Sequence, residues 1–423
     1  MRGFFTLNKA FLSSLVVFTR ISLLFISNKV LAVFLGPAVY AIVGQFQNLM
    51  TVMHAGASLG LQNAWVSLTA EFSKDTSKRL ALWRAGLHLS FFSLAAVSLL
   101  LIFLSWSGFL SFLFPTLSEK TLRLLLLCTI PGVASMLLIT IVQSILNGLS
   151  AFKLWAKVSI GVSLVQSLWL ISFVLWKFNS VLWALATQSL LSLLFLFIYL
   201  YRKIPIKKLL ESKSASLKEW TNFIWMGLVP MILTPIVLSL VRSFVGHTLG
   251  WDQAGLWQGA FRISDFFSLI VSSILGVLIL PQLSKLKNEK AFYNTLWRSL
   301  TCVFIFSFLS ISFFYAFKTI LIQWVLSSSF LPIADQIQIQ WIGDFFRSGS
   351  WCLGLALMVK QETKIFILFE FITQIIFLSF TYFGLSSLKM AAPFWAYAIE
   401  NMTGFLLMFF FLLRSHYLWK KKF

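Results

Sequence analysis

Residues 85–107 read AGLHLSFFSLAAVSLLLIFLSWS and contain no Asp, Glu, Lys or Arg. An α-helix needs about 20 mostly apolar residues to cross the hydrocarbon core of a bilayer, so this stretch predicts one membrane crossing. Similar runs recur along all 423 residues, of which 59% are apolar and 11% charged, against roughly 25% charged in soluble domains. The sequence therefore predicts a protein that crosses the membrane many times.

Apolar runs, with Gly, Pro and charge clusters at their ends, predict an all-α polytopic membrane protein of about twelve transmembrane helices. The first six are expected at roughly 10–35, 38–70, 80–107, 120–147, 153–176 and 179–201. The second six are expected at roughly 220–248, 253–281, 294–317, 333–359, 363–385 and 389–414. The two sets predict two six-helix bundles.

A polar, charge-rich stretch from Arg202 to Glu219 divides the chain almost in half. We expect an N-terminal bundle over residues 1–203, a cytoplasmic linker over 204–219 and a C-terminal bundle over 220–423. Each half has an even number of predicted helices, so an internal duplication would leave the two halves in the same orientation.

The net charge of +21 is explained by where the Lys and Arg residues lie. With the N-terminus inside, 24 basic residues fall in cytoplasmic segments, and the opposite side holds only Lys120, Arg123, Lys177, Lys318 and Lys389. This positive-inside bias predicts that both termini are cytoplasmic. The basic excess faces anionic lipid head groups, so no nucleic-acid partner is expected.

Cysteine and histidine usage indicates neither a metal site nor a redox pair. Cys128, Cys302 and Cys352 each stand alone in an apolar segment, and the four histidines lack metal-ligand spacing. We expect packing cysteines, no metal and no cofactor.

Nine charged residues remain inside the predicted helices, where each needs a protein partner, an aqueous cavity or a substrate. The five basic ones are Arg20, Lys29, Arg242, Arg262 and Arg347, and the four acidic ones are Asp265, Asp344, Glu370 and Glu400. Arg262 with Asp265, and Asp344 with Arg347, are i,i+3 pairs that can neutralise each other on one helix face. Two interpretations stay open: structural ion pairs, or cations that bind phosphate beside carboxylates that orient them or carry a proton.

The predicted helix over 38–70 carries one polar stripe. Its members, at steps of four, three, four and four, are Gln47, Thr51, His54, Ser58 and Gln62. Such a stripe lines a wet passage or supplies hydrogen bonds between helices, and both interpretations are kept.

Five segments of the chain resemble one family of membrane transporters. They read NKVLAVFLGP (28–37), AGLWQGAFRISD (254–265), LPQLSKL (280–286), WIGDFFR (341–347) and FILFE (366–370). These motifs resemble the Wzx-type flippases for lipid III and O-antigen. That family is the polysaccharide transporter branch of the multidrug/oligosaccharidyl-lipid/polysaccharide exporter superfamily.

The resemblance implies two six-helix bundles around a central cationic cavity that work by alternating access. It implies a cargo, a short oligosaccharide on undecaprenyl diphosphate, moved across the bacterial inner membrane without catalysis. It also implies a suspected coupling to a proton or sodium gradient, with a glycan polymerase and a chain-length regulator as candidate partners.

The family pattern places cavity residues at Lys29, Arg242, Asp265, Asp344, Arg347 and Glu370. We add Arg20, a basic position in the first helix, and Glu400, a further carboxylate. The cations expected to bind the substrate are Arg20, Lys29, Arg242 and Arg347, and the carboxylates expected to serve coupling or ion pairing are Asp265, Asp344, Glu370 and Glu400. Arg262 departs from the family pattern and is expected to line the cavity.

Two other functions stay open. A membrane enzyme acting on polyprenyl-linked sugars would need catalytic groups on a substantial aqueous loop, whereas the predicted outward connections are about 10 to 18 residues at most. A drug or cation exporter of the same superfamily would favour exposed carboxylates over a positive interior.

Overall fold

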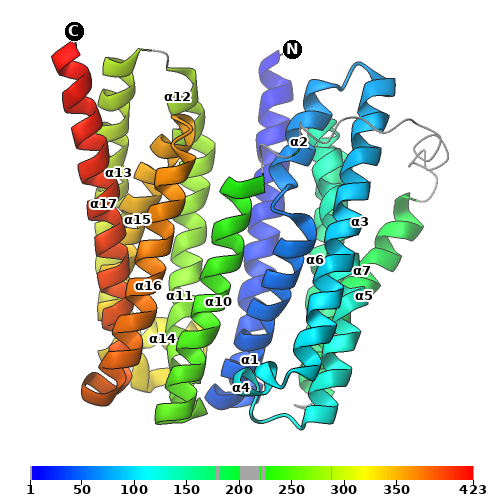
Figure 1. Ribbon diagram of the computed structural model, residues 1–423, viewed down its shortest axis with the longest axis vertical. Helices are drawn as coiled ribbons and strands as arrows, with labels where there is room; N and C mark the ends of the chain where they lie inside the picture. The colour runs from blue at the N-terminus through cyan, green and yellow to red at the C-terminus, as the bar shows by residue number, and fades with distance from the viewer. Residues whose placement is uncertain (1, 177–180, 201–219, 221–223, 287, 423) are drawn as a thin grey trace. The chain divides into compact units, whose positions relative to one another are not determined.

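The computed structural model describes residues 2–176, 181–200, 220, 224–286 and 288–422 (Figure 1). Within these ranges every regular element is a helix and no strand occurs. The predicted all-α fold class is therefore confirmed.

The chain divides into two compact units, and each is considered by itself. Unit 1 comprises residues 1–35 and 42–236, and unit 2 comprises residues 36–41 and 237–423. The predicted linker over 204–219 lies outside the described residues, so the predicted domain boundaries stay a prediction.

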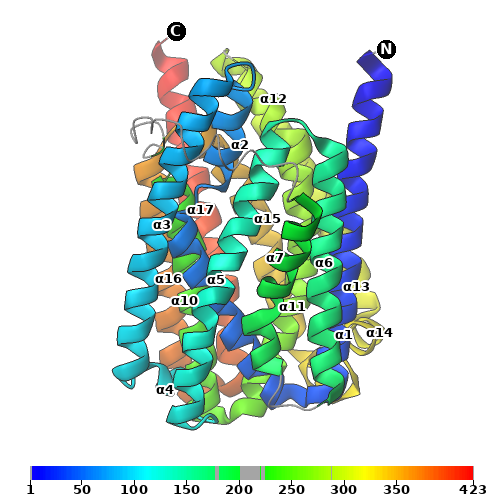
Figure 2. The ribbon, with the colours of Figure 1, turned by 90° about the vertical axis from the view of Figure 1, so that its right-hand side faces the viewer.

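Unit 1 is built around α5 (Glu119–Gly148), which packs against α2 (Gln62–Glu71), α3 (Thr76–Trp106), α6 (Phe152–Trp176) and α7 (Val181–Leu200). It also contains most of α1 (Arg2–Ser58), the short α4 (Phe109–Leu113) and the start of α10 (Ile224–Leu249). Figure 2 shows α5, α6 and α7 running alongside one another. Lipid tails are as apolar as leucine, so close packing and hydrogen bonds between helices hold such a bundle together.

Two backbone breaks change the predicted helices of the first 70 residues. Gly36 has a φ of 70°, in the left-handed region, and Pro37 follows it, so α1 bends where two helices were expected to meet. The predicted single helix over 38–70 is wrong. Leu59 and Gly60 have φ values of 51° and 66°, which end α1 at Ser58 and let α2 begin at Gln62.

Unit 2 continues α10 with α11 (Trp251–Ile274), a π-helical turn (Leu275–Ile279) and α12 (Leu280–Lys285). The next long helix is α13 (Glu289–Ala316), followed by α14 (Lys318–Val325), a 3-10 segment (Ser328–Asp335) and α15 (Ile337–Val359). The last elements are α16 (Thr363–Leu388), a short 3-10 turn (Lys389–Ala391) and α17 (Ala392–Lys422).

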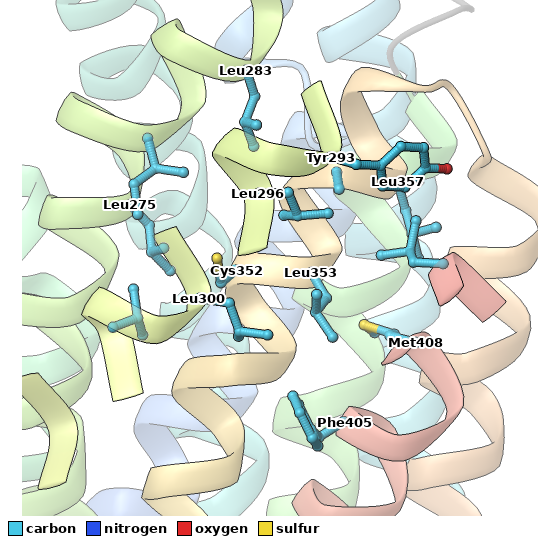
Figure 3. Close-up of a cluster of buried hydrophobic side chains, with 14 of the residues drawn as sticks. Leu275, Leu283, Tyr293, Leu296, Leu300, Cys352, Leu353, Leu357, Phe405 and Met408 are labelled. Carbon is cyan, nitrogen blue, oxygen red and sulfur yellow. The ribbon is translucent and has the colours of Figure 1, made fainter. Parts of the chain in front are cut away.

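The apolar core of unit 2 joins α11, α12, α13, α15 and α17. Leu296 and Leu353 are fully buried there, and Figure 3 shows them beside Cys352 and Met408. Cys352 is 0% exposed, which fits the packing role expected for it.

Eight helices in the described part of the chain are long and apolar enough to cross a membrane. Two of these segments, Ser14–Glu71 and Thr363–Tyr417, have 58 and 55 residues, although about 20 suffice for one crossing. The chain is a multi-pass membrane protein. Neither α11 nor α15, the two helices that carry the predicted i,i+3 charge pairs, is among the eight, so the total of twelve crossings stays a prediction.

Candidate functional site

Asp344 is the centre of a polar cluster inside unit 2. Its side chain on α15 is 1% exposed, and Ser264 on the adjacent α11 donates a hydrogen bond to Oδ2 over 2.5 Å. Tyr397 on α17 donates to Oδ1 over 2.8 Å. A carboxylate that accepts two hydrogen bonds is far less costly to bury than an unpaired one.

Arg347 reaches Asp344 through Tyr397. The Nη1 atom of Arg347 donates to the Tyr397 hydroxyl over 3.0 Å, and that hydroxyl donates onward to Asp344. The direct ion pair predicted between Asp344 and Arg347 is absent from the ion pairs of the described residues. The hydroxyl lies between the two charges and relays the interaction.

Gly343 makes this arrangement sterically feasible. A Cβ atom at position 343 would lie 2.4 Å from the Tyr397 ring, which is far too close for two carbon atoms. The missing side chain lets α17 approach α15 closely enough for the Tyr397 hydroxyl to reach Asp344.

The guanidinium of Arg347 also lies among aromatic rings. Its central carbon is 4.6 Å from the centre of the Trp351 ring and 6.0 Å from that of Phe261. Ring faces attract cations and leave the edge of the guanidinium free to form hydrogen bonds. Among the described residues, Arg347 is thus held by ring contacts on its faces and by one hydrogen bond, to Tyr397.

Arg262 and Asp265 form the predicted i,i+3 ion pair on α11. The Nη1 and Oδ2 atoms are 3.4 Å apart, and the two side chains are 17% and 32% exposed. Asp265 also lies within electrostatic range of Arg242 and Arg347. This pair is therefore the more accessible part of the cluster.

Arg242 on α10 is a buried cation with partners on α11. It is 1% exposed and donates a hydrogen bond to the side-chain oxygen of Gln258 on α11. Its guanidinium carbon is 5.9 Å from the centre of the Trp257 ring. Arg242 is therefore enclosed by protein.

Glu400 adds a carboxylate one turn beyond Tyr397 on α17. The Gln374 side chain on α16 donates to its Oε1 atom over 2.6 Å, and Glu400 is 8% exposed. Glu370 on α16 is close enough to interact electrostatically with Glu400, as is Arg347. Arg347 therefore lies within electrostatic range of Asp265, Asp344 and Glu400, and Glu370 lies near Glu400.

Unit 1 contains a different kind of site, a polar cavity of about 410 Å³ between α1, α2, α5 and α6. Arg20, His54 and Gln62, three of the predicted residues, line it. The His54 Nε2 atom is 3.2 Å from the Thr140 hydroxyl on α5. Polar side chains make up most of the lining, which is unusual for a bundle in lipid.

The other predicted residues of unit 1 lie elsewhere. Thr51 is exposed and donates to the Gln47 carbonyl, whereas Ser58 is buried and donates to the Ala55 carbonyl. Lys29 on α1 is partly buried and does not line the cavity. The break at Leu59 and Gly60 thus divides the predicted stripe between two helices.

Tyr397, Ser264, Gln258 and Gln374 are site residues that the sequence interpretation missed. Each is an isolated polar residue in an apolar helix, which is the available signal. No group of three or more His, Cys, Asp or Glu that could hold a metal ion occurs among the residues described.

Comparison with known proteins identifies relatives of the chain. Residues 30–335 match the sequence model of a family described as "Polysaccharide biosynthesis protein". Two curated relatives, from Escherichia coli (strain K12) and Shigella flexneri, are both named lipid III flippase. Each is 24% identical over 351 residues, which cover 81% of this chain and 82% of the relative.

Solved structures share the fold. An inward-facing multidrug resistance MATE family transporter of the MOP superfamily has a TM-score of 0.72 at 14% identity, covering 95% of both chains. A MOP superfamily transporter from Pyrococcus furiosus has a TM-score of 0.65 at 12% identity, covering 95% of this chain and 94% of that one. That transporter has a binding pocket of reverse polarity, which suggests a different function for it.

Proposed function

Because the chain belongs to the family of polysaccharide biosynthesis proteins, we propose that it is a flippase for an undecaprenyl-diphosphate-linked oligosaccharide. The cargo is lipid III or an O-antigen repeat unit, and it moves from the cytoplasmic to the periplasmic leaflet of the bacterial inner membrane. The curated relatives are flippases, which are transporters, so the prediction that the chain is not an enzyme is confirmed.

The observation that carries the proposal concerns Arg347. This cation lies within the helices of a membrane protein and still has N–H donors available for a ligand. A guanidinium carries five N–H donors in a fork that matches phosphate oxygens. In unit 2, Arg347 uses one of these donors on a neutral hydroxyl, and its faces contact aromatic rings. A diphosphate would compete well for the remaining donors, because charge-assisted hydrogen bonds are roughly twice as strong as neutral ones.

Phosphate binding at Arg347 has a structural consequence at Asp344. If the guanidinium turns toward the phosphate, Tyr397 loses the hydrogen bond that it accepts from Arg347. The hydrogen bond that Tyr397 donates to Asp344 then changes in strength. Proton or sodium binding at one of the carboxylates Asp265, Asp344, Glu370 and Glu400 would then couple cargo movement to an ion gradient. Alternating access follows if cargo and ion favour different conformations.

The proposed orientation places both termini in the cytoplasm, as the charge distribution requires. Cysteines engineered at positions 2, 213 and 420 should stay unlabelled by an impermeant reagent applied to intact cells. Labelling from outside at any of them would refute this orientation. A glycan polymerase and a chain-length regulator remain the proposed partners.

A drug or cation exporter is the second candidate, because a MATE family transporter shares the fold. Such a protein would take its cargo on exposed carboxylates. In unit 2, however, Asp344 and Glu400 are 1% and 8% exposed and already accept hydrogen bonds. Asp265 is more exposed, at 32%, but it is paired with Arg262. The burial of Asp344 and Glu400 and the pairing of Asp265 favour the anionic cargo.

Complementation of a flippase-deficient strain tests the proposal. The variants are Arg347→Ala and Arg347→Lys, with surface glycan and membrane protein level measured together. Arg298→Ala, at an exposed arginine on α13, is the matched control.

We expect Arg347→Ala to abolish glycan delivery at normal protein level, and Arg347→Lys to retain part of it because the charge stays and the fork is lost. Full delivery by Arg347→Ala would refute the assignment of the phosphate site. Failure of the wild-type chain to restore any surface glycan, across strains with different repeat units, would refute the flippase function.

A further inference from the structure

The cavity of unit 1 is bordered by two helices whose lining residues have the same spacing. On α5 the lining includes Met136, Thr140, Gln143 and Asn147, at steps of four, three and four. On α6 it includes Trp155, Ser159, Val162 and Gln166, at the same steps. Residues at this spacing share one helix face, so each helix turns a continuous surface toward the cavity.

Amide side chains dominate the polar part of this lining. They are Gln62 and Asn63 on α2, Gln143 and Asn147 on α5, and Gln166 on α6. None of the five amide groups makes a hydrogen bond with another residue in the described part of the chain. Each amide has two N–H donors and one carbonyl acceptor, so hydrogen-bond donors and acceptors lie next to one another in the cavity lining.

The charge of the cavity excludes several ligand classes. No Asp or Glu lies among the described residues that line it, and Arg20 is the only Lys or Arg. A lipophilic cation would find no counter-charge there, and a polyanion would find a single guanidinium. Neutral groups that both donate and accept hydrogen bonds, such as sugar hydroxyls and acetamido groups, match the lining best.

Trp155 supplies an apolar surface in the same cavity. The side chain is partly buried on α6, one turn before Ser159. A pyranose ring has an apolar C–H face and a rim of hydroxyls, so an indole ring beside amides can contact both. The volume of about 410 Å³ falls within the roughly 300–1,000 Å³ typical of small-molecule sites.

The position of the cavity fits the loading step. It is lined by α2, by the C-terminal half of α5 and by α6 from its first turn onward. In unit 1, α2 and the connection between α5 and α6 lie at the same end as the start of α1 (Figure 2). The charge distribution assigns that end to the cytoplasm, where the cargo is loaded.

We propose that this cavity is a glycan subsite that binds uncharged sugar residues of the cargo through Gln143, Asn147, Gln166 and the face of Trp155. The inference rests on the proposed function. It assigns the binding of neutral sugars to the cavity of unit 1 and the binding of the diphosphate to Arg347 in unit 2.

Saturation-transfer NMR on the full chain in lipid nanodiscs tests this subsite, since the method detects weak binding of free sugars. The probes are N-acetylglucosamine, galactose and rhamnose. The variant is the double substitution Gln143→Leu with Gln166→Leu, which keeps side-chain volume and removes two amides. The matched control is Gln188→Leu on α7, an amide of unit 1 outside the cavity.

We expect at least one sugar to bind the wild type and the Gln188→Leu control alike, and the double variant to bind it about tenfold more weakly, as the loss of two hydrogen bonds predicts. If the double variant does not fold, competition on the wild type decides: a second neutral sugar should displace the first and tetraphenylphosphonium should not. Equal binding by a folded double variant, no sugar binding at all, or displacement by tetraphenylphosphonium would overturn the inference.

Glycan delivery by the wild type in the complementation assay separates the two hypotheses. Delivery without sugar binding would reject the subsite and leave the flippase function standing. Sugar binding without delivery in any strain would reject the flippase function.

Discussion

The polar groups of the two units differ in whether the protein itself satisfies them. In unit 2, Asp344 accepts hydrogen bonds from Ser264 and Tyr397, and Glu400 accepts one from Gln374. In unit 1, the amides lining the cavity make no side-chain hydrogen bonds within the described part of the chain. Buried charges must be paired within the protein, whereas neutral amides in a wet cavity can form hydrogen bonds with water or with a ligand. Mutations should therefore destabilise unit 2 and leave unit 1 folded but less active.

Removing the Asp344 carboxylate should have the largest effect. Asp344→Ala leaves Ser264 and Tyr397 without their shared acceptor and removes a carboxylate that interacts electrostatically with Arg347. Breaking such a buried network costs about 3–5 kcal/mol. We expect loss of glycan delivery together with a lower melting temperature and lower membrane abundance. The control is Asp335→Ala at an exposed aspartate of the 3-10 segment. A melting temperature equal to that of the control would contradict the role of Asp344 as the centre of the cluster.

Arg20→Ala should abolish glycan delivery while leaving stability unchanged. The side chain is exposed, lines the cavity of unit 1 and has no ion-pair partner among the described residues, so the fold does not depend on it. Melting temperature and surface glycan should be measured on the same preparations as for Asp344→Ala. Similar losses of stability in both variants would contradict the claim that the polar groups of unit 2, and not those of unit 1, stabilise the fold. Full delivery by Arg20→Ala would remove Arg20 from the transport cycle.

Tyr397→Phe should have an intermediate effect, because it removes one hydroxyl and keeps the ring. The hydroxyl makes two hydrogen bonds, one of them to a carboxylate, so about 1–3 kcal/mol of stability should be lost. Delivery should fall and remain detectable. Thermal unfolding in detergent measures the first effect, and an unchanged unfolding temperature would show that Asp344 and Arg347 do not need the relay.

Thr140→Val is the counterpart in unit 1 and should have the smallest effect. It also removes one hydroxyl at constant shape. Among the described residues, the hydrogen-bond partner of that hydroxyl is the His54 ring, at 3.2 Å. Because water in the cavity can replace that contact, we expect no more than about 0.5–1 kcal/mol of lost stability. A loss as large as that of Tyr397→Phe would show that unit 1 depends on its own polar contacts as much as unit 2 does.

The sequence predicted the elements of the fold better than their ends. Apolar runs near membrane length identified α3, α5 and α6 to within a few residues. The break at Leu59 and Gly60 was missed, since a lone Gly is tolerated in helices and no Pro marks the site. The bend at Gly36 was predicted because Gly and Pro coincide there.

The candidate site was predictable only where its parts are close in sequence. The spacing of Arg262 and Asp265 indicated an ion pair, which forms at 3.4 Å. The same spacing at Asp344 and Arg347 gave no direct pair, because Tyr397, about 50 residues later, lies between them in space. Contacts between helices depend on how the helices pack, and periodicity within one helix does not specify that packing.

Binding of undecaprenyl diphosphate, without any sugar, to the purified chain tests the central claim most directly. The claim is that Arg347 grips the diphosphate of the cargo, so the affinities of the wild type, Arg347→Ala and Arg347→Lys should be compared in nanodiscs, with undecaprenol as the uncharged reference lipid. We predict that the wild type prefers the diphosphate to undecaprenol, that Arg347→Ala loses about tenfold or more in affinity, and that Arg347→Lys lies between the two. Equal affinity of the wild type and Arg347→Ala for undecaprenyl diphosphate would contradict the claim.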